Sequence, residues 1–229
     1  MVNRFFSVAT LLLLLLLVGC ASPTKMAFYD DSETITNSSN PVYLMTATLK
    51  NSYKTSHQPK LLVVNVEKEI VTGREDRLNF TMDDKAKNES SDPDMGNHYF
   101  LRMALEPGNF VIRGLTSQSS SFPINGFFFA PIHENIEVSD GGVYYLGHIS
   151  ATVREREGDE FKAGPSIPLI DQAVVGASGG TFDIEITDQW AKDEAAFRRK
   201  FPALATVDVK KVILPSFDRN RAQKWWEDN

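Results

Sequence analysis

Apolar and polar residues alternate with a period of two along much of the chain, which is the pattern of β-strands that bury one face. Before residue 116 four segments carry this pattern, and their expected buried side chains are Tyr43, Met45, Ala47 and Leu49, then Leu62, Val64 and Val66, then Tyr99, Leu101, Met103 and Leu105, then Phe110, Ile112 and Leu115. Glu106-Pro107-Gly108-Asn109 predicts a type II turn, because proline presets φ and glycine accepts a positive φ. We therefore expect residues 99–105 and 110–115 to form a hairpin.

Three further apolar runs, 127–129, 136–138 and 143–153, continue the strand pattern. In the longest run we expect one face to carry Val143, Tyr145, Ile149, Ala151 and Val153 and the other to carry Tyr144, His148, Ser150 and Thr152. The cleanest alternation is in 181–187, where Phe182, Ile184 and Ile186 should face inward.

Helical spacing appears only near the C-terminus. Residues 188–201 predict a helix in which Glu194 and Arg198 form an i,i+4 pair, with Pro202 as its stop. A last strand over 207–213 and a helical tail over 216–229 follow. Because no helix separates the earlier strands, the chain predicts a mainly β fold: an antiparallel β-sandwich over 42–215 with one or two short C-terminal helices.

The first 19 residues read as a secretory signal, with Arg4 followed by an apolar run that is too short to span a bilayer. Leu17-Val18-Gly19-Cys20 resembles the lipobox of bacterial lipoprotein precursors. The resemblance implies that Cys20 is lipidated and becomes the first residue of a protein anchored in the cell envelope. Ala21, in place of Asp, implies an outer-membrane destination. Residues 20–41 are then expected to be the lipidated cysteine and a polar tether.

Composition narrows the function classes. A formal net charge of −6 argues against nucleic-acid binding and against attraction to anionic lipid. With 42% hydrophobic and 10% aromatic residues, the chain can build a core and is not intrinsically disordered. Cys20 is the only cysteine, which excludes an intramolecular disulfide and a multi-cysteine metal site.

Two motifs carry a wider resemblance. The Leu105-Glu106-Pro107-Gly108-Asn109-Phe110 turn between strands resembles the transthyretin-like, carboxypeptidase-regulatory-type sandwiches of bacterial envelope proteins. Gly142-Val143-Tyr144-Tyr145-Leu146-Gly147, followed by the strand, helix and Phe201-Pro202 order, resembles an uncharacterised family of envelope lipoproteins. The resemblance implies a transthyretin-/Ig-like sandwich and an envelope location, and it brings no reaction and no catalytic residues.

The sharpest catalytic candidate is Ser178, within Gly176-Ala177-Ser178-Gly179-Gly180. A Gly-x-Ser-x-Gly elbow places its serine between a strand and a helix, whereas Ser178 precedes the predicted strand 181–187. Ala177 also replaces the Asp of the chymotrypsin-type motif. A glycine-rich turn explains the segment better, and a serine hydrolase using Ser178 stays as an alternative.

Metal-site patterns are incomplete. His133-Glu134-Asn135-Ile136-Glu137 begins like His-Glu-x-x-His but ends in Glu, and we expect a loop there. Asp92–Asn97 has calcium-loop character, but its glycine falls one place early and no bidentate Glu follows. We expect no metal, and no cofactor besides the covalent lipid on Cys20.

Residues 163–175 are apolar without a clean period, and Pro165 and Pro168 disfavour a central strand. The densest apolar group there is Ile167, Leu169 and Ile170. The segment either covers the sandwich, which we favour, or offers an apolar surface to a partner.

Together these features predict a lipid-anchored envelope protein that acts as a non-catalytic binding or structural module. Its expected partners are the membrane, through the anchor, and another envelope component, but no nucleic acid. The alternatives are the Ser178 hydrolase and a carrier of apolar ligands whose cavity is lined by Phe127, Phe128 and Phe129.

Overall fold

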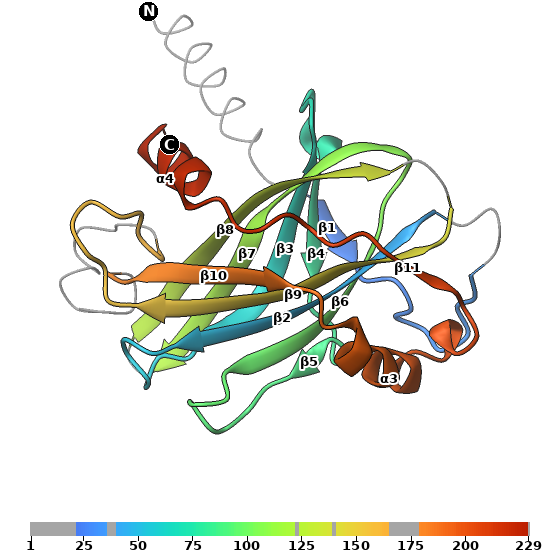
Figure 1. The fold of residues 1–229 in the computed structure, drawn as a ribbon, viewed down its shortest axis with the longest axis horizontal. Coiled ribbons are helices and arrows are strands. Elements are labelled where there is room, and N and C mark those ends of the chain that lie inside the picture. The colour runs from blue at the N-terminus through green and yellow to red at the C-terminus, as the bar shows by residue number, and fades with distance from the viewer. Residues whose placement is uncertain (1–21, 36–39, 122–123, 139–140, 165–178, 229) are drawn as a thin grey trace, which may run out of the picture.

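The computed structural model describes residues 22–35, 40–121, 124–138, 141–164 and 179–228, and these form two packed β-sheets with two α-helices (Figure 1). The first sheet has the order β1 (Ser22–Lys25), β4 (Arg77–Thr81), β3 (Lys60–Lys68), β7 (Gly108–Ser121) and β8 (Ile124–Val138). The second has the order β10 (Thr181–Thr187), β9 (Val143–Arg154), β2 (Val42–Asn51), β6 (Asn97–Ala104) and β5 (Lys87–Asn88), with β11 (Val209–Lys211) also paired to β9. The helices are η1 (Arg74–Asp76), α3 (Trp190–Lys200), η2 (Pro202–Leu204) and α4 (Arg219–Asp228). The mainly β prediction is confirmed.

The main core lies between the two sheets. Its fully buried side chains include Met45, Leu49, Val64, Phe80, Leu101, Ile112, Leu115, Ile149, Val153 and Phe182. Each large apolar side chain buried in this way contributes about 1.5–3 kcal/mol relative to an exposed one. Most of the apolar residues in the period-two pattern therefore lie on the strand faces that point into the core between the two sheets.

The sheets are mixed, so the expectation of a purely antiparallel sandwich is wrong. At the centre of the six-stranded sheet β2 and β9 run parallel, with Val42 opposite Val143. The pairs β1–β4 and β9–β11 are parallel as well. The chain crosses between the sheets after β1, β2, β4, β6 and β8. The strands of each parallel pair are therefore not consecutive in the chain, and no tight turn between them sets an antiparallel direction.

The predicted hairpin of residues 99–105 and 110–115 is also wrong. β6 and β7 belong to different sheets, and the turn before Gly108, whose φ is 145°, carries the chain from one sheet to the other. β7 instead forms a hairpin with β8, in which Ser121 lies opposite Ile124. Alternation shows which face of a strand is buried but not which strand lies beside it.

Bulges change two predicted faces. The register shifts between Leu61 and Val63, so Leu61 is buried while Leu62 is 38% exposed, the reverse of the prediction. In β9 a second shift lies at Gly147, whose φ is 111°. Because one extra residue reverses the alternation, Tyr145 lies on the outer face with His148, and not with Ile149 as expected.

The N-terminal segment is part of the domain and not the free polar tether expected over 20–41. Strand β1 pairs with β4 from Ser22 onward, and Met26 and Phe28 are buried. Residues 22–35 join the domain because these apolar side chains reach its two clusters. The predicted signal 1–19 and Cys20 lie outside the described residues.

A second apolar cluster covers the outer face of the six-stranded sheet. Phe197 and Phe201, from α3 and the residue after it, pack against Leu44, Phe100 and Tyr145. The helix predicted over 188–201 is confirmed as α3, with the expected Glu194–Arg198 pair at 2.8 Å. β2 is thus buried on both faces where a half-buried strand was expected.

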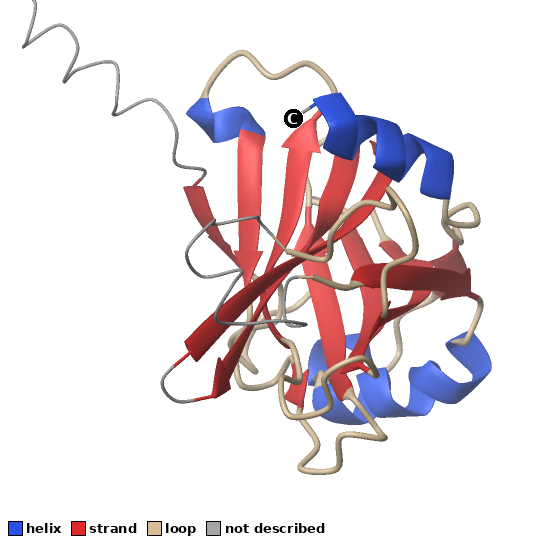
Figure 2. Ribbon diagram, turned by 90° about the vertical axis from the view of Figure 1, so that its left-hand side faces the viewer, coloured by secondary structure: helices blue, strands red, loops and turns tan. Residues whose placement is uncertain are grey.

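The sequence predicts a helical tail over 216–229, and the helix is confirmed as α4. The helix is not a free tail, because α4 packs against β8 and Ala222 is 1% exposed. Figure 2 shows α4 at the top and α3 at the bottom of the sandwich. Among the described residues, no helix has the length and apolarity needed to cross a membrane.

Candidate functional site

An aromatic groove of about 610 Å³ lies between β8, the segment 161–164 and α4. It is lined by Thr116, Phe127, Phe128, Phe129, Pro131, Phe161, Lys162, Gly164, Trp225 and Trp226. Six of these ten residues carry an aromatic ring. A volume of this size with few polar groups is typical of pockets for small apolar ligands. We define these ten residues as the aromatic groove.

Strand β8 supplies one wall because its side chains alternate. Phe128 faces the core, is 1% exposed and contacts Phe182 at 6.4 Å between ring centroids, whereas Phe127 is 47% exposed. The Phe129 ring lies 5.4 Å from that of Trp225. Since β8 is the last strand of its sheet, its outer edge is free to pair with the segment before Gly164, and the Phe129 amide donates to the Ala163 carbonyl at 2.7 Å.

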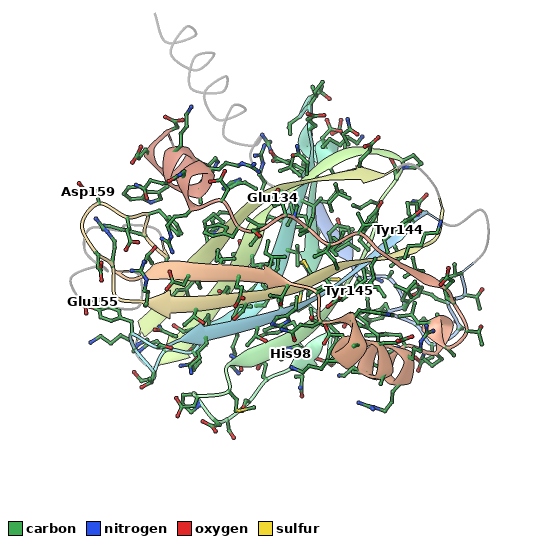
Figure 3. All side chains as sticks on the ribbon, in the orientation of Figure 1. His98, Glu134, Tyr144, Tyr145, Glu155 and Asp159 are labelled. Carbon is green, nitrogen blue, oxygen red and sulfur yellow. The ribbon has the colours of Figure 1, made fainter. Side chains whose placement is uncertain are left out.

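Polar side chains of α4 fix the helix on both sides. Gln223 accepts a hydrogen bond from the Phe161 amide at 2.6 Å and donates to the Asp159 carbonyl at 2.8 Å. Arg221 donates to the His133 carbonyl at 2.7 Å and to Glu134 at 3.1 Å. In Figure 3, Asp159 and Glu134 flank α4, as these contacts require. Trp225 and Trp226 therefore lie on a helix whose position is set by these hydrogen bonds.

A network of four charged side chains lies next to Phe161. Arg154 pairs with Glu160 at 2.6 Å and with Asp183 at 2.9 Å, and Arg219 pairs with the same two carboxylates at 3.2 and 2.6 Å. The hydrogen bond from Arg154 lowers the pKa of Glu160 to about 2. The Arg219 guanidinium also lies 5.2 Å from the centroid of the Phe161 ring. This charge network joins β9, β10 and the first turn of α4, and so holds Phe161 and α4 in place at the groove.

His133 lies behind Trp225, with 4.8 Å between their ring centroids. It is the extra residue of a β-bulge, where its φ is 54°, and it is 4% exposed. Neither ring nitrogen has a hydrogen-bond partner among the described residues. Burial, aided by the charges of Arg113 and Arg221, lowers the pKa of His133 to about 4. The His133 imidazole is therefore uncharged at neutral pH.

A separate buried polar network lies under α3. Asp193 accepts hydrogen bonds from Thr46 at 2.5 Å and from Tyr145 at 2.7 Å, and Thr46 lies 2.9 Å from His148 Nδ1. The His98 ring stacks on the His148 ring, with 5.7 Å between their centroids (Figure 3). Because Thr46 donates to Asp193, its oxygen accepts from His148. The network seats α3 on the sheet.

Several candidates from the sequence fall elsewhere. Ser178 and the group Ile167, Leu169 and Ile170 lie outside the described residues. His133 and Glu134 lie in β8, so the loop expected there is wrong, and Glu134 pairs with Arg221 at 3.1 Å. Within the described part of the chain, no three His, Cys, Asp or Glu side chains are grouped as a metal site would require.

The sequence placed Phe127, Phe128 and Phe129 at an apolar cavity, and the structure adds Phe161, Trp225 and Trp226. Nothing in the sequence indicates that these rings meet, because 80 residues (139–218) separate β8 from α4. The adjacent Trp225-Trp226 pair in a short polar helix was the one available signal.

Comparison of the chain with protein-family models, curated proteins and solved structures finds no match.

Proposed function

We propose that this chain is a lipid-anchored bacterial envelope protein that acts as a non-catalytic binding module, and that its aromatic groove takes an apolar ligand with an acyl chain. The observation that carries the proposal is the groove of about 610 Å³ with six aromatic residues. The same proposal includes a transthyretin-like sandwich, which the two packed sheets support. The outer membrane is the proposed location, on the basis of Ala21 after Cys20.

The lining chemistry favours a hydrocarbon over a peptide. A bound peptide buries backbone N–H and C=O groups, each of which needs a partner. The groove offers few: the hydroxyl of Thr116 already donates to Asn65 at 2.6 Å, and the remaining side chains, apart from Lys162, are chiefly apolar. The lining residues that the structure describes are mostly aromatic and apolar, which supports binding of an apolar ligand.

The ligand proposal predicts that Phe127→Ala weakens binding of an apolar fluorescent probe to the protein expressed without residues 1–20. We expect a rise in Kd of about tenfold, equivalent to about 1.4 kcal/mol, because one exposed ring of the groove is lost. Probe titration, with intrinsic tryptophan fluorescence as a second signal, measures the change. Folding should persist, since Phe127 is 47% exposed.

Leu62→Ala is the matched control, because Leu62 is also a half-exposed apolar strand residue but does not line the groove. Equal affinities of wild type and Phe127→Ala would contradict the ligand proposal. A groove already filled by residues 165–178 would also contradict it, and would show as no probe binding in wild type and binding restored by Leu169→Ala.

The anchor proposal predicts that Cys20→Ser abolishes lipid attachment, because Cys20 is the only thiol and directly follows the predicted signal. Labelled palmitate should be incorporated into wild type alone, and the variant should leave the membrane fraction or stay unprocessed. Palmitate in the variant would disprove anchoring through Cys20.

A further inference from the structure

The described domain starts two residues after Cys20, because strand β1 begins at Ser22. An extended residue spans at most about 3.6 Å, so the Cα atoms of Cys20 and Ser22 are no more than about 7 Å apart. If Cys20 carries lipid in the bilayer, the start of β1 is held close to the membrane surface. The orientation of the domain then follows from what lies around Ser22.

The loop between β3 and β4 lies at this end of the molecule. Ser22 is opposite Leu78, the second residue of β4, and residues 69–76 immediately precede that strand. Figures 1 and 2 both show the loop and η1 projecting above the start of β1. We call residues 69–76 the proximal loop.

The proximal loop carries an exposed apolar side chain on a constrained backbone. Ile70 is 76% exposed, more than any other large apolar side chain among the described residues. Asp76 is 5% exposed, accepts hydrogen bonds from Thr72 and Gly73 and pairs with Lys68 at 3.0 Å. These bonds lower the pKa of Asp76 well below its usual range, so the carboxylate stays ionised and keeps its partners in the loop and on Lys68.

We propose that the proximal loop rests on the phospholipid surface to which the protein is anchored, with Ile70 inserted at the boundary between headgroups and acyl chains. This proposal rests on lipidation of Cys20. A bilayer is the proposed occupant because β1 begins only two residues after the anchor, which leaves little space between the membrane and the loop. Transfer of the exposed Ile70 side chain out of water is also favourable. Insertion here needs no net positive charge, since the covalent lipid already holds the domain at the surface.

The test uses the lipidated full chain in phosphatidylcholine and phosphatidylethanolamine vesicles. Since Cys20 is the only cysteine and its sulfur carries the lipid, Ile70→Cys provides a single thiol for an environment-sensitive fluorophore. We expect a blue shift and at least twofold quenching by lipids that carry a quencher just below the headgroups. Met95→Cys is the control, because Met95 is 69% exposed. The loop between β5 and β6 that carries it lies at the bottom of Figure 1, on the side of the molecule away from the proximal loop at the top.

Flotation with the vesicles reports the anchor separately. Protein that floats but shows equal, low quenching at positions 70 and 95 would overturn the proximal-loop proposal and leave the anchor intact. Failure to float would overturn the anchor itself. Protection of position 70 from a water-soluble thiol reagent in cell envelopes, but not in pure vesicles, would assign the loop to a protein partner and also overturn the proposal.

Discussion

Asp83→Ala is expected to lower the free energy of unfolding by about 3–5 kcal/mol, because it leaves a buried positive charge without its partner. Arg102 is 0% exposed on the outer face of β6, and its guanidinium pairs with the Asp83 carboxylate. Its other nitrogens donate to the Ala27 carbonyl at 2.8 Å and the Phe100 carbonyl at 3.0 Å. The pair thus joins β6 to the N-terminal segment and to the chain after β4.

Urea unfolding of the two single variants Asp83→Ala and Asp84→Ala measures this effect. Asp84 is the matched control, because its fully exposed carboxylate pairs with Lys87 at 3.4 Å, and loss of such a surface pair should leave stability nearly unchanged. Adding Arg102→Met to Asp83→Ala should recover part of the loss by removing the unpaired charge. A value for Asp83→Ala within 1 kcal/mol of wild type would refute the expectation.

Acid is expected to destabilise the protein between about pH 6.5 and 4. Burial, with the neighbouring charge of His98, lowers the pKa of His148 to about 4, and burial lowers that of His133 to about 4 as well. Asp193 partly opposes the shift of His148, and Lys192 adds to it. Because the unfolded chain binds protons near pH 6.5 and the folded chain does not, each histidine removes up to about 3 kcal/mol as the pH falls through this range.

The measurement is the free energy of unfolding in urea at pH 7.5, 6.0, 5.0 and 4.5. His148→Gln should reduce the slope below pH 6 by about 1 kcal/mol per pH unit, because it removes one of the two histidines with a pKa near 4. Carboxylates such as Glu160, with a pKa near 2, lose their contribution at lower pH and are thereby distinguished from the histidines. A wild-type stability that stays constant from pH 6.5 to 4.5 would disprove the histidine effect.

The positions of the strands could be predicted from the sequence, because burial of one face leaves a period-two pattern. Phe182, Ile184 and Ile186 all contact the main core as predicted, and α3 lies where the helical spacing places it. The errors at Leu62 and Tyr145 have one cause, since a single bulged residue reverses the alternation without any change in composition.

The candidate site was less accessible to prediction. Three phenylalanines of β8 suggest an apolar cavity, but its other wall comes from α4, for which the sequence predicts a helical tail and no contact with β8. The pairing of Arg102 with Asp83 was equally hidden, because an arginine in an alternating strand normally faces water. Such contacts depend on which distant elements meet.

The sequence by itself determined the mainly β class, the strand positions, the helix α3 and the residues that suggest a lipid anchor, since each depends on local spacing or on adjacent residues. Only the tertiary structure decided that β2 and β9 run parallel, that residues 22–35 join the sandwich, and that α4 closes an aromatic groove over β8. The physical reason is that hydrophobic burial is not directional. It sets which side chains leave water, while strand order, bulges and buried charge pairs set which of them meet.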